Sequence, residues 1–165
     1  MGKPMPLNSV TIRPYRGDVD FPSLVAFVAM QYEHERERQA EGRVHGGKMA
    51  PQYAQELIDA VEGRRGCLLI ADVEATPVGF IAAYCASDPD PVLIEEAREH
   101  GFVRDLFVLP MWRRMGVATR LVHEAEAHFR TLGINRLRLA GAAQNEAMLC
   151  LVVALNFQPY AAVYD

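Results

Sequence analysis

The segment between residues 102 and 132 constrains the fold of this chain more than any other. Residues 102–110 are apolar except for Arg104 and Asp105 and read as a strand, which ends at Pro110 because proline cannot donate to a sheet ladder. From about Gly116 to Leu132, apolar residues return at the spacing of a helix that packs one face on a core. A strand, a tight turn and an amphipathic helix predict a domain in which helices cover a sheet. The expected core face of this helix is Val117, Leu121, Val122, Ala125 and Phe129, and Gly133 suits its C-terminal cap.

Strand and helix signals alternate in the same way through the rest of the chain. Two apolar strands, 67–74 and 78–86, are separated by a short polar link, which predicts an antiparallel hairpin. Asn145 precedes an almost entirely apolar helix that we expect to be buried on most sides, and Asn156 suits the left-handed residue that ends it. Further strands are predicted over 10–15, 136–140 and 157–165, and further helices over 24–39 and 51–62, with Asp18 or Asp20 as the cap of the first and Pro51 in the first turn of the second. These patterns predict one mixed α/β domain over residues 9–165, after a flexible N-terminus at residues 1–8.

Composition narrows the class of protein. The chain has 165 residues and is 50% hydrophobic, which suits one globular domain with a core. Its formal net charge of -4 disfavours nucleic-acid binding. No apolar run is long enough to cross a bilayer, and the N-terminal residues lack the apolar centre of a signal peptide. We therefore expect a cytoplasmic protein that binds neither nucleic acid nor a membrane.

The cysteines give no sign of a disulfide framework. Cys67, Cys85 and Cys150 are odd in number, widely spaced, and set in apolar stretches. This pattern predicts reduced, buried core cysteines. No histidine stands near them at metal-ligand spacing, so we expect no metal site.

The turn before the helix, in the stretch RRMGVATRL (113–121), has the features of an anion site. The first turn of a helix leaves backbone N–H groups without partners, and the helix dipole adds positive charge there. Gly116 lets a ligand approach the backbone, and Arg113 and Arg114 add charge. The alternative reading is an ordinary strand–turn–helix connection of an α/β protein, because short motifs of this kind occur by chance.

The same residues resemble the acetyl-CoA-binding motif of the GNAT acetyltransferase superfamily. The stretch DLFVLPMWRRMGVATRLV is similar to that motif at Val108, Pro110, Arg113, Gly116 and Ala118. NEAMLCLVVALNF resembles a second family motif, with Asn145 and Phe157 in register. The order of strands and helices over residues 9–165 is also similar. The resemblance implies the GNAT fold, which is a mixed, mostly antiparallel sheet flanked by helices, with a splayed central strand pair.

The resemblance also implies which residues hold acetyl-CoA, the cosubstrate, without a metal. The loop backbone would cradle the pyrophosphate, and the strand edge would pair with the pantetheine arm. The amide of Leu106 or Phe107 would polarise the thioester carbonyl. Asn145 would contact the pantetheine arm, or would only cap its helix. The full implied set is Leu106, Phe107, Val108, Arg113, Arg114, Met115, Gly116, Val117, Ala118, Thr119 and Asn145.

The chain departs from the family pattern at the catalytic base. Many members carry Glu where this chain has Arg104. Asp105, Glu99 and His100 are the nearby substitutes for the base. For Asp105 the favoured reading is instead a structural carboxylate that bonds backbone or pairs with an arginine, and Glu99 and His100 also read as solvated loop residues.

The chain departs from the family pattern at the general acid too. The position where many members carry Tyr is Val152 here. Tyr160, Tyr84 and Tyr164 are possible replacements for the acid, although aromatic residues in apolar strands more often belong to a core. The loss is tolerable because a leaving thiol has a pKa of about 8.5.

The reaction implied by the resemblance is direct transfer of an acetyl group from acetyl-CoA to a primary amine of a small molecule or peptide. The alternative is a module with the same fold that binds acyl-CoA as a sensor with little or no turnover. The acidic insertion, with Asp88, Asp90, Glu95 and Glu96, would attract a cationic amine, whereas Arg104 would hold a carboxylate on the acceptor. The loop from 33 to 51 corresponds to the family's acceptor side. A homodimer through the C-terminal strand is a further expectation.

Overall fold

The computed structural model describes residues 9–38, 47–141 and 145–160. Five strands form one sheet in the order β1-β2-β3-β4-β5, namely Val10–Pro14, Cys67–Val73, Thr76–Ser87, Glu99–Val108 and Leu137–Leu139. The first four pair antiparallel, and β5 pairs parallel to β4. The predicted hairpin between β2 and β3 and the mixed α/β class are confirmed.

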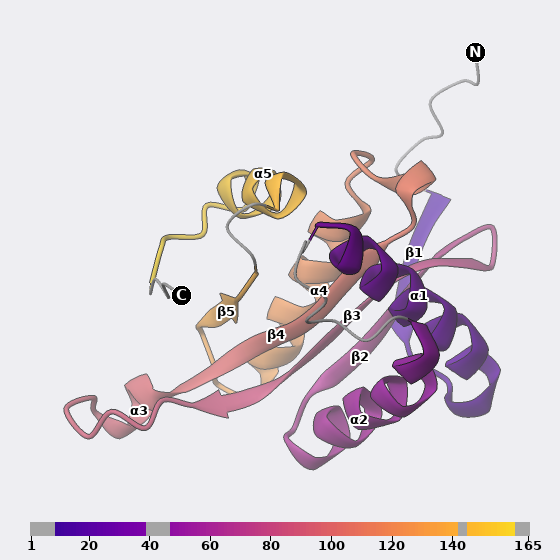
Figure 1. Cartoon of the computed structure of the whole chain (residues 1–165). Helices are drawn as coiled ribbons and strands as arrows, with labels where there is room; N and C mark the ends of the chain where they lie inside the picture. Colours follow the sequence, from indigo (N-terminus) through magenta and orange to yellow (C-terminus); the bar gives the residue numbers. More distant parts are fainter. Residues whose placement is uncertain (1–8, 39–46, 142–144, 161–165) are drawn as a thin grey trace.

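Helices cover both faces of the sheet (Figure 1). On one face lie α1 (Gly17–Arg38) and α2 (Ala50–Gly63), where Leu24, Phe27 and Leu57 are buried with Phe80 of β3. On the other lies α4 (Val117–Thr131), which buries the five predicted residues Val117, Leu121, Val122, Ala125 and Phe129. The apolar spacing of each helix therefore fixes which face it turns to the sheet. No helix within the described ranges combines the length and apolar character that crossing a membrane requires.

The start of α1 differs from the prediction and shows what ties it down. The helix begins at Gly17, so Asp18 and Asp20 lie in its first turn and do not cap a later start. Asp20 is 1% exposed and accepts hydrogen bonds from both terminal nitrogens of Arg13 and from the backbone N–H of Arg16. Arg13 also pairs with Asp72 of β2. Asp20 thus joins the start of α1 to β1 directly, and to β2 through Arg13.

This buried carboxylate predicts a loss of stability in acid. The hydrogen bond from Arg13 lowers the pKa of Asp20 from 3.8 to about 2. A carboxyl whose folded pKa is depressed stabilises the fold above its unfolded pKa and loses that contribution as pH falls through the folded value. We expect about 2 kcal/mol of unfolding free energy to disappear between pH 5 and about 2. Urea unfolding across this range would measure it, and Asp20→Asn should remove this part of the pH dependence. An equal acid sensitivity in that variant would contradict the assignment.

The C-terminal part departs from the prediction most. The apolar helix forms as α5 (Glu146–Ala154), with Asn145 as its N-cap, and Asn156 has the expected positive φ of 61°. None of its residues is buried, although Leu151 and Leu155 pack against the α4 side of the core, so the expectation of burial on most sides was wrong. Cys150 on this helix is exposed, which corrects the prediction that all three cysteines are core residues. Residues 157–160 form no strand, and the rest of the predicted last strand lies outside the described residues.

Candidate functional site

The turn between β4 and α4 leaves the start of the helix open. A short 3-10 helix, Pro110–Trp112, follows the strand, and Gly116 at the N-cap has a left-handed φ of 78°. Within the described part of the chain, no side chain caps α4. The backbone N–H of Arg120 donates to the carbonyl of Gly116 at 3.1 Å, so the amides of Val117, Ala118 and Thr119 precede the first intrahelical donor. These amides and the helix dipole are the groups that the anion site predicted from the sequence would use, and the site itself stays a prediction.

The two arginines of this turn differ in role. The Nε of Arg113 donates to the carbonyl of Val108 at 2.9 Å, and its guanidinium lies 5.8 Å from the ring centroid of Phe107. Its side chain therefore ties the turn back to β4. Arg114 is exposed and has a positive φ of 64°, which leaves its charge at the surface of the turn.

The edge of β4 beside this turn is open. Pairing between β4 and β5 covers only Gly101 to Val103, and its last pair is Val103 with Leu139. On its other edge β4 stays paired with β3 as far as Val108 opposite Gly79. Residues 104–108 thus face no strand on the β5 side among the residues described, and the two strands diverge there (Figure 1). This splayed pair places Leu106, Phe107 and Val108 where the resemblance puts the pantetheine arm.

A bulge marks the point where the strands part. Ala82 pairs with Asp105 and Ala83 pairs with Val103, so Arg104 is an extra residue that has no pairing partner on β3. Bulges of this kind redirect side chains next to active sites. The guanidinium of Arg104 lies 5.6 Å from the ring centroid of Tyr53 on α2.

Asp105 is held by side chains from both helices on its face of the sheet. It is 7% exposed, and its two carboxylate oxygens accept hydrogen bonds from Gln31 of α1 at 2.9 Å and from the hydroxyl of Tyr53 at 2.7 Å. Burial, and next the charge of Asp105, raise the pKa of Tyr53 above its ordinary 10, so Tyr53 stays a donor. The other amide atom of Gln31, Oε1, is buried and has no partner among the described residues. The carboxylate therefore joins α1, α2 and β4.

The other candidate bases lie far from Leu106. Glu99 and His100 begin β4, six or seven residues earlier, which is about 20 Å along a strand. Glu99 forms an exposed ion pair with Arg65. His100 is buried beside the carbonyl of Arg98, and burial lowers its pKa. The fold does not bring either of them to the splayed strands.

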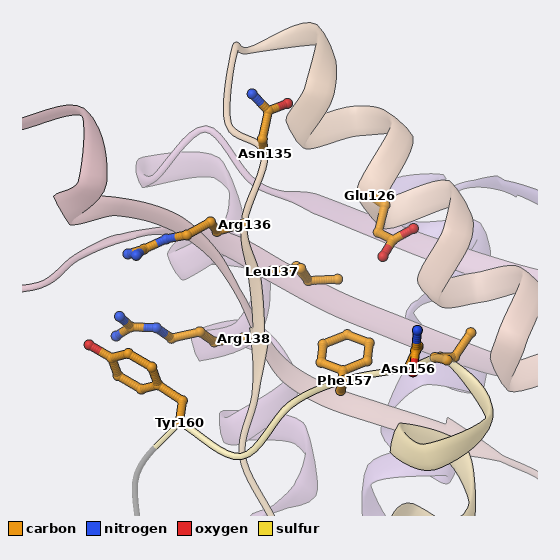
Figure 2. Close-up of a pocket in the computed structure, with 9 residues that line it drawn as sticks. Glu126, Asn135, Arg136, Leu137, Arg138, Asn156, Phe157 and Tyr160 are labelled. Atoms are coloured by element: carbon orange, nitrogen blue, oxygen red, sulfur yellow. The ribbon is translucent and has the colours of Figure 1, made fainter.

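Among the tyrosine candidates, Tyr160 lies away from Leu106. The hydroxyl of Tyr160 donates to Asp88 at 2.9 Å, and the guanidinium of Arg138 lies 3.7 Å from its ring centroid (Figure 2). Tyr160 lines a pocket of about 310 Å³ between α4, β5 and the end of α5, to which neither β4 nor the turn before α4 contributes. Tyr84 lies opposite Phe102, and Tyr164 is outside the described residues.

Asn145 has a defined structural role. Its side-chain oxygen accepts a hydrogen bond from the backbone N–H of Met148 at 3.2 Å, which makes it the N-cap of α5. Its contact with the pantetheine arm stays a prediction.

Sequence reasoning missed Gln31 and Tyr53. Both are polar residues within helices, where a polar side chain ordinarily indicates a solvated position. They meet Asp105 only through tertiary contacts, and no local motif marks them.

Comparison with known proteins agrees with this geometry. An aminoglycoside N-acetyltransferase, AAC(6')-Iy, solved with CoA, has a TM-score of 0.69 and 18% identity, covering 94% of this chain and 92% of that chain. The aminoglycoside 6'-N-acetyltransferase AAC(6')-IG from Acinetobacter haemolyticus has a TM-score of 0.68 and 18% identity, covering 94% of this chain and 95% of that chain. A mutant of the BH1408 protein from Bacillus halodurans has a TM-score of 0.76 and 19% identity, covering 94% of this chain and 97% of that chain. At these identities the structural likeness establishes the fold alone.

The sequence comparisons decide the family. No curated protein matches the sequence. The model of the acetyltransferase (GNAT) family matches residues 27–155, which include β4, the turn, α4 and all of α5. This match covers most of the chain and includes the resembling segment from Asp105 to Val122 in full. The chain therefore belongs to the acetyltransferase (GNAT) family.

Proposed function

We propose that the protein is an acetyl-CoA-dependent N-acetyltransferase that acts on a primary amine of a small molecule or peptide. The observation that carries this proposal is the uncapped start of α4 at Gly116 beside the unpaired edge of β4 at Leu106–Val108. A pyrophosphate fits the first feature, and an amide-bearing pantetheine arm fits the second. The remaining proposed contacts are the backbone from Arg113 to Thr119 and the side chain of Asn145.

The proposed chemistry needs little from the side chains. Acetyl-CoA supplies the activated acyl group when bound. The amide of Leu106 or Phe107 would donate to the developing oxyanion, which the lack of a strand beside residues 104–108 among the described residues supports. The amine nitrogen forms a bond to the acyl carbon as the carbon–sulfur bond breaks, and the amine proton leaves to water or a side chain. A thiolate leaves readily without a dedicated acid.

One observation favours a second candidate function, a binding module with little turnover. Neither Arg104 nor Val152 can act as the usual base and acid, and the hydroxyl of Tyr160 already donates to Asp88.

Two structural neighbours are named as aminoglycoside N-acetyltransferases, so aminoglycosides belong among the acceptors to be tested.

The deciding experiment is release of free thiol from acetyl-CoA across polyamines, amino acids, aminoglycosides and peptide amines. We expect a saturable rate with one acceptor class and calorimetric binding of acetyl-CoA. A blank with enzyme alone is needed because Cys150 is exposed and reacts with thiol reagents. Binding without turnover would favour the binding module, and no binding of acetyl-CoA would refute both functions.

A further inference from the structure

Arg104 is an exposed cation at the point where β4 and β5 part. Within the described part of the chain it makes no hydrogen bond or ion pair, and its recorded contact is with the ring of Tyr53, at 5.6 Å. The nearest carboxylate, Asp105, accepts its bonds from Gln31 and from the Tyr53 hydroxyl. The charge of Arg104 is therefore available to a ligand.

The surroundings of Arg104 are aromatic and basic. Tyr84 and Phe102 pair across β3 and β4 with ring centroids 5.8 Å apart, and both are half-buried. The guanidinium of Arg64, which follows α2, lies 4.7 Å from the ring of Tyr84. Tyr53, Asp105, Tyr84 and Tyr32 raise the pKa of Arg104, so the guanidinium stays charged. We call Arg64, Tyr84, Phe102 and Arg104 the arginine platform.

The arginine platform adjoins the proposed site of transfer. Arg104 stands two residues before Leu106, about 7 Å along the strand. An arginine side chain spans that distance, and its planar fork binds a carboxylate with two parallel hydrogen bonds. A polycationic acceptor would meet two arginines here.

The acidic insertion does not reverse this charge. Asp88 accepts hydrogen bonds from Arg138 at 3.0 Å and from Tyr160, and Arg138 lowers the pKa of Asp88 to about 2. Asp90 is exposed and accepts from the backbone N–H of Val92 at 2.9 Å. Asp88 is thus already paired with Arg138 and Tyr160 of the protein.

We propose that the acceptor amine carries a carboxylate, and that Arg104 binds this carboxylate and thereby selects amino-acid-like acceptors. The proposal rests on the proposed acetyl transfer and names its substrate class. Arg104 acts in recognition and takes no part in moving the amine proton.

The kinetic test compares amino acids with their carboxamides, each pair differing only in the acidic group. We expect wild type to have the higher kcat/KM for the acids, and Arg104→Gln to reduce the acid-to-amide ratio by about 10- to 100-fold. Comparing the ratio between proteins cancels the different basicity of the two amines. Arg104→Lys should recover part of the ratio, because it keeps the charge and loses the fork. Arg130→Gln, on the exposed end of α4, is the matched control and should leave the ratio unchanged.

A binding measurement separates this inference from the proposed function. The affinity of the CoA-loaded protein for an N-acetylated amino acid and for its amide is measured by calorimetry in wild type and Arg104→Gln. If wild type binds the acid more tightly than the amide and Arg104→Gln loses this preference, the proposal is supported. This holds even if no acceptor yields free thiol, because the absence of thiol release contradicts only the proposed transferase activity. Faster transfer to amides or polyamines, with ratios equal in wild type and Arg104→Gln, would overturn the proposal and leave the transferase standing. Equal affinity for acid and amide in wild type would overturn it too.

Discussion

Gly116→Trp abolishes binding of acetyl-CoA, with an expected loss of at least about 100-fold in affinity. Gly116 has a φ of 78°, a conformation that costs a residue with a Cβ about 1 to 2 kcal/mol. The larger effect is steric, because an indole at the N-cap fills the approach to the amides of Val117, Ala118 and Thr119. Calorimetric titration with acetyl-CoA measures the loss directly, and circular dichroism checks that the variant folds.

Gly133 provides a matched control on the same helix. It follows the C-terminus of α4 with a φ of 77°, and a Cβ there meets nothing within 4 Å. Gly133→Trp therefore introduces similar backbone strain without touching the turn before α4. We expect it to keep the wild-type affinity for acetyl-CoA. Unchanged affinity in a folded Gly116→Trp protein would refute the pyrophosphate site.

Local signals were enough to predict the part of the site that lies in one segment. The strand that ends near Pro110, the glycine N-cap and the five buried residues of α4 depend on spacings within about 30 residues of chain, and each was found where expected. The caps at Asn145 and Gly133 were likewise predicted, because a cap is set by its nearest neighbours.

The predictions were wrong where contacts between residues distant in sequence determine the structure. The apolar composition of α5 indicates that its residues prefer burial. It does not indicate whether other elements cover them, and among the described residues the helix is covered on one side at most. The bulge at Arg104 depends on the register between β3 and β4, which neither strand encodes alone. Tyr160 meets Asp88 across 72 residues, which removed it from the place expected of a general acid.

Asp105 is the clearest case of such a distant contact, and it leads to the second large effect. Its partners Gln31 and Tyr53 are 74 and 52 residues away in sequence. Asp105→Leu leaves both partly buried donors without this acceptor, at about 1 to 3 kcal/mol each. We expect a loss of about 3 to 5 kcal/mol in unfolding free energy, measured by urea denaturation. Tyr53→Phe removes only one of the two bonds and should lose about 1 kcal/mol. A loss below 1 kcal/mol in Asp105→Leu would contradict the bracing role.

The same residue decides between a structural carboxylate and a catalytic base. Both oxygens of Asp105 already accept hydrogen bonds, so we expect Asp105→Asn, which keeps the size and one acceptor, to reduce kcat less than tenfold. The pH dependence of kcat should keep its shape in this variant, because the proton of the amine then leaves by another route. A fall of several orders of magnitude in a folded Asp105→Asn protein, together with loss of the acidic limb of the pH profile, would instead make Asp105 the base. In that case the hydrogen bonds from Tyr53 and Gln31 would orient the base that the residue at position 104 cannot provide.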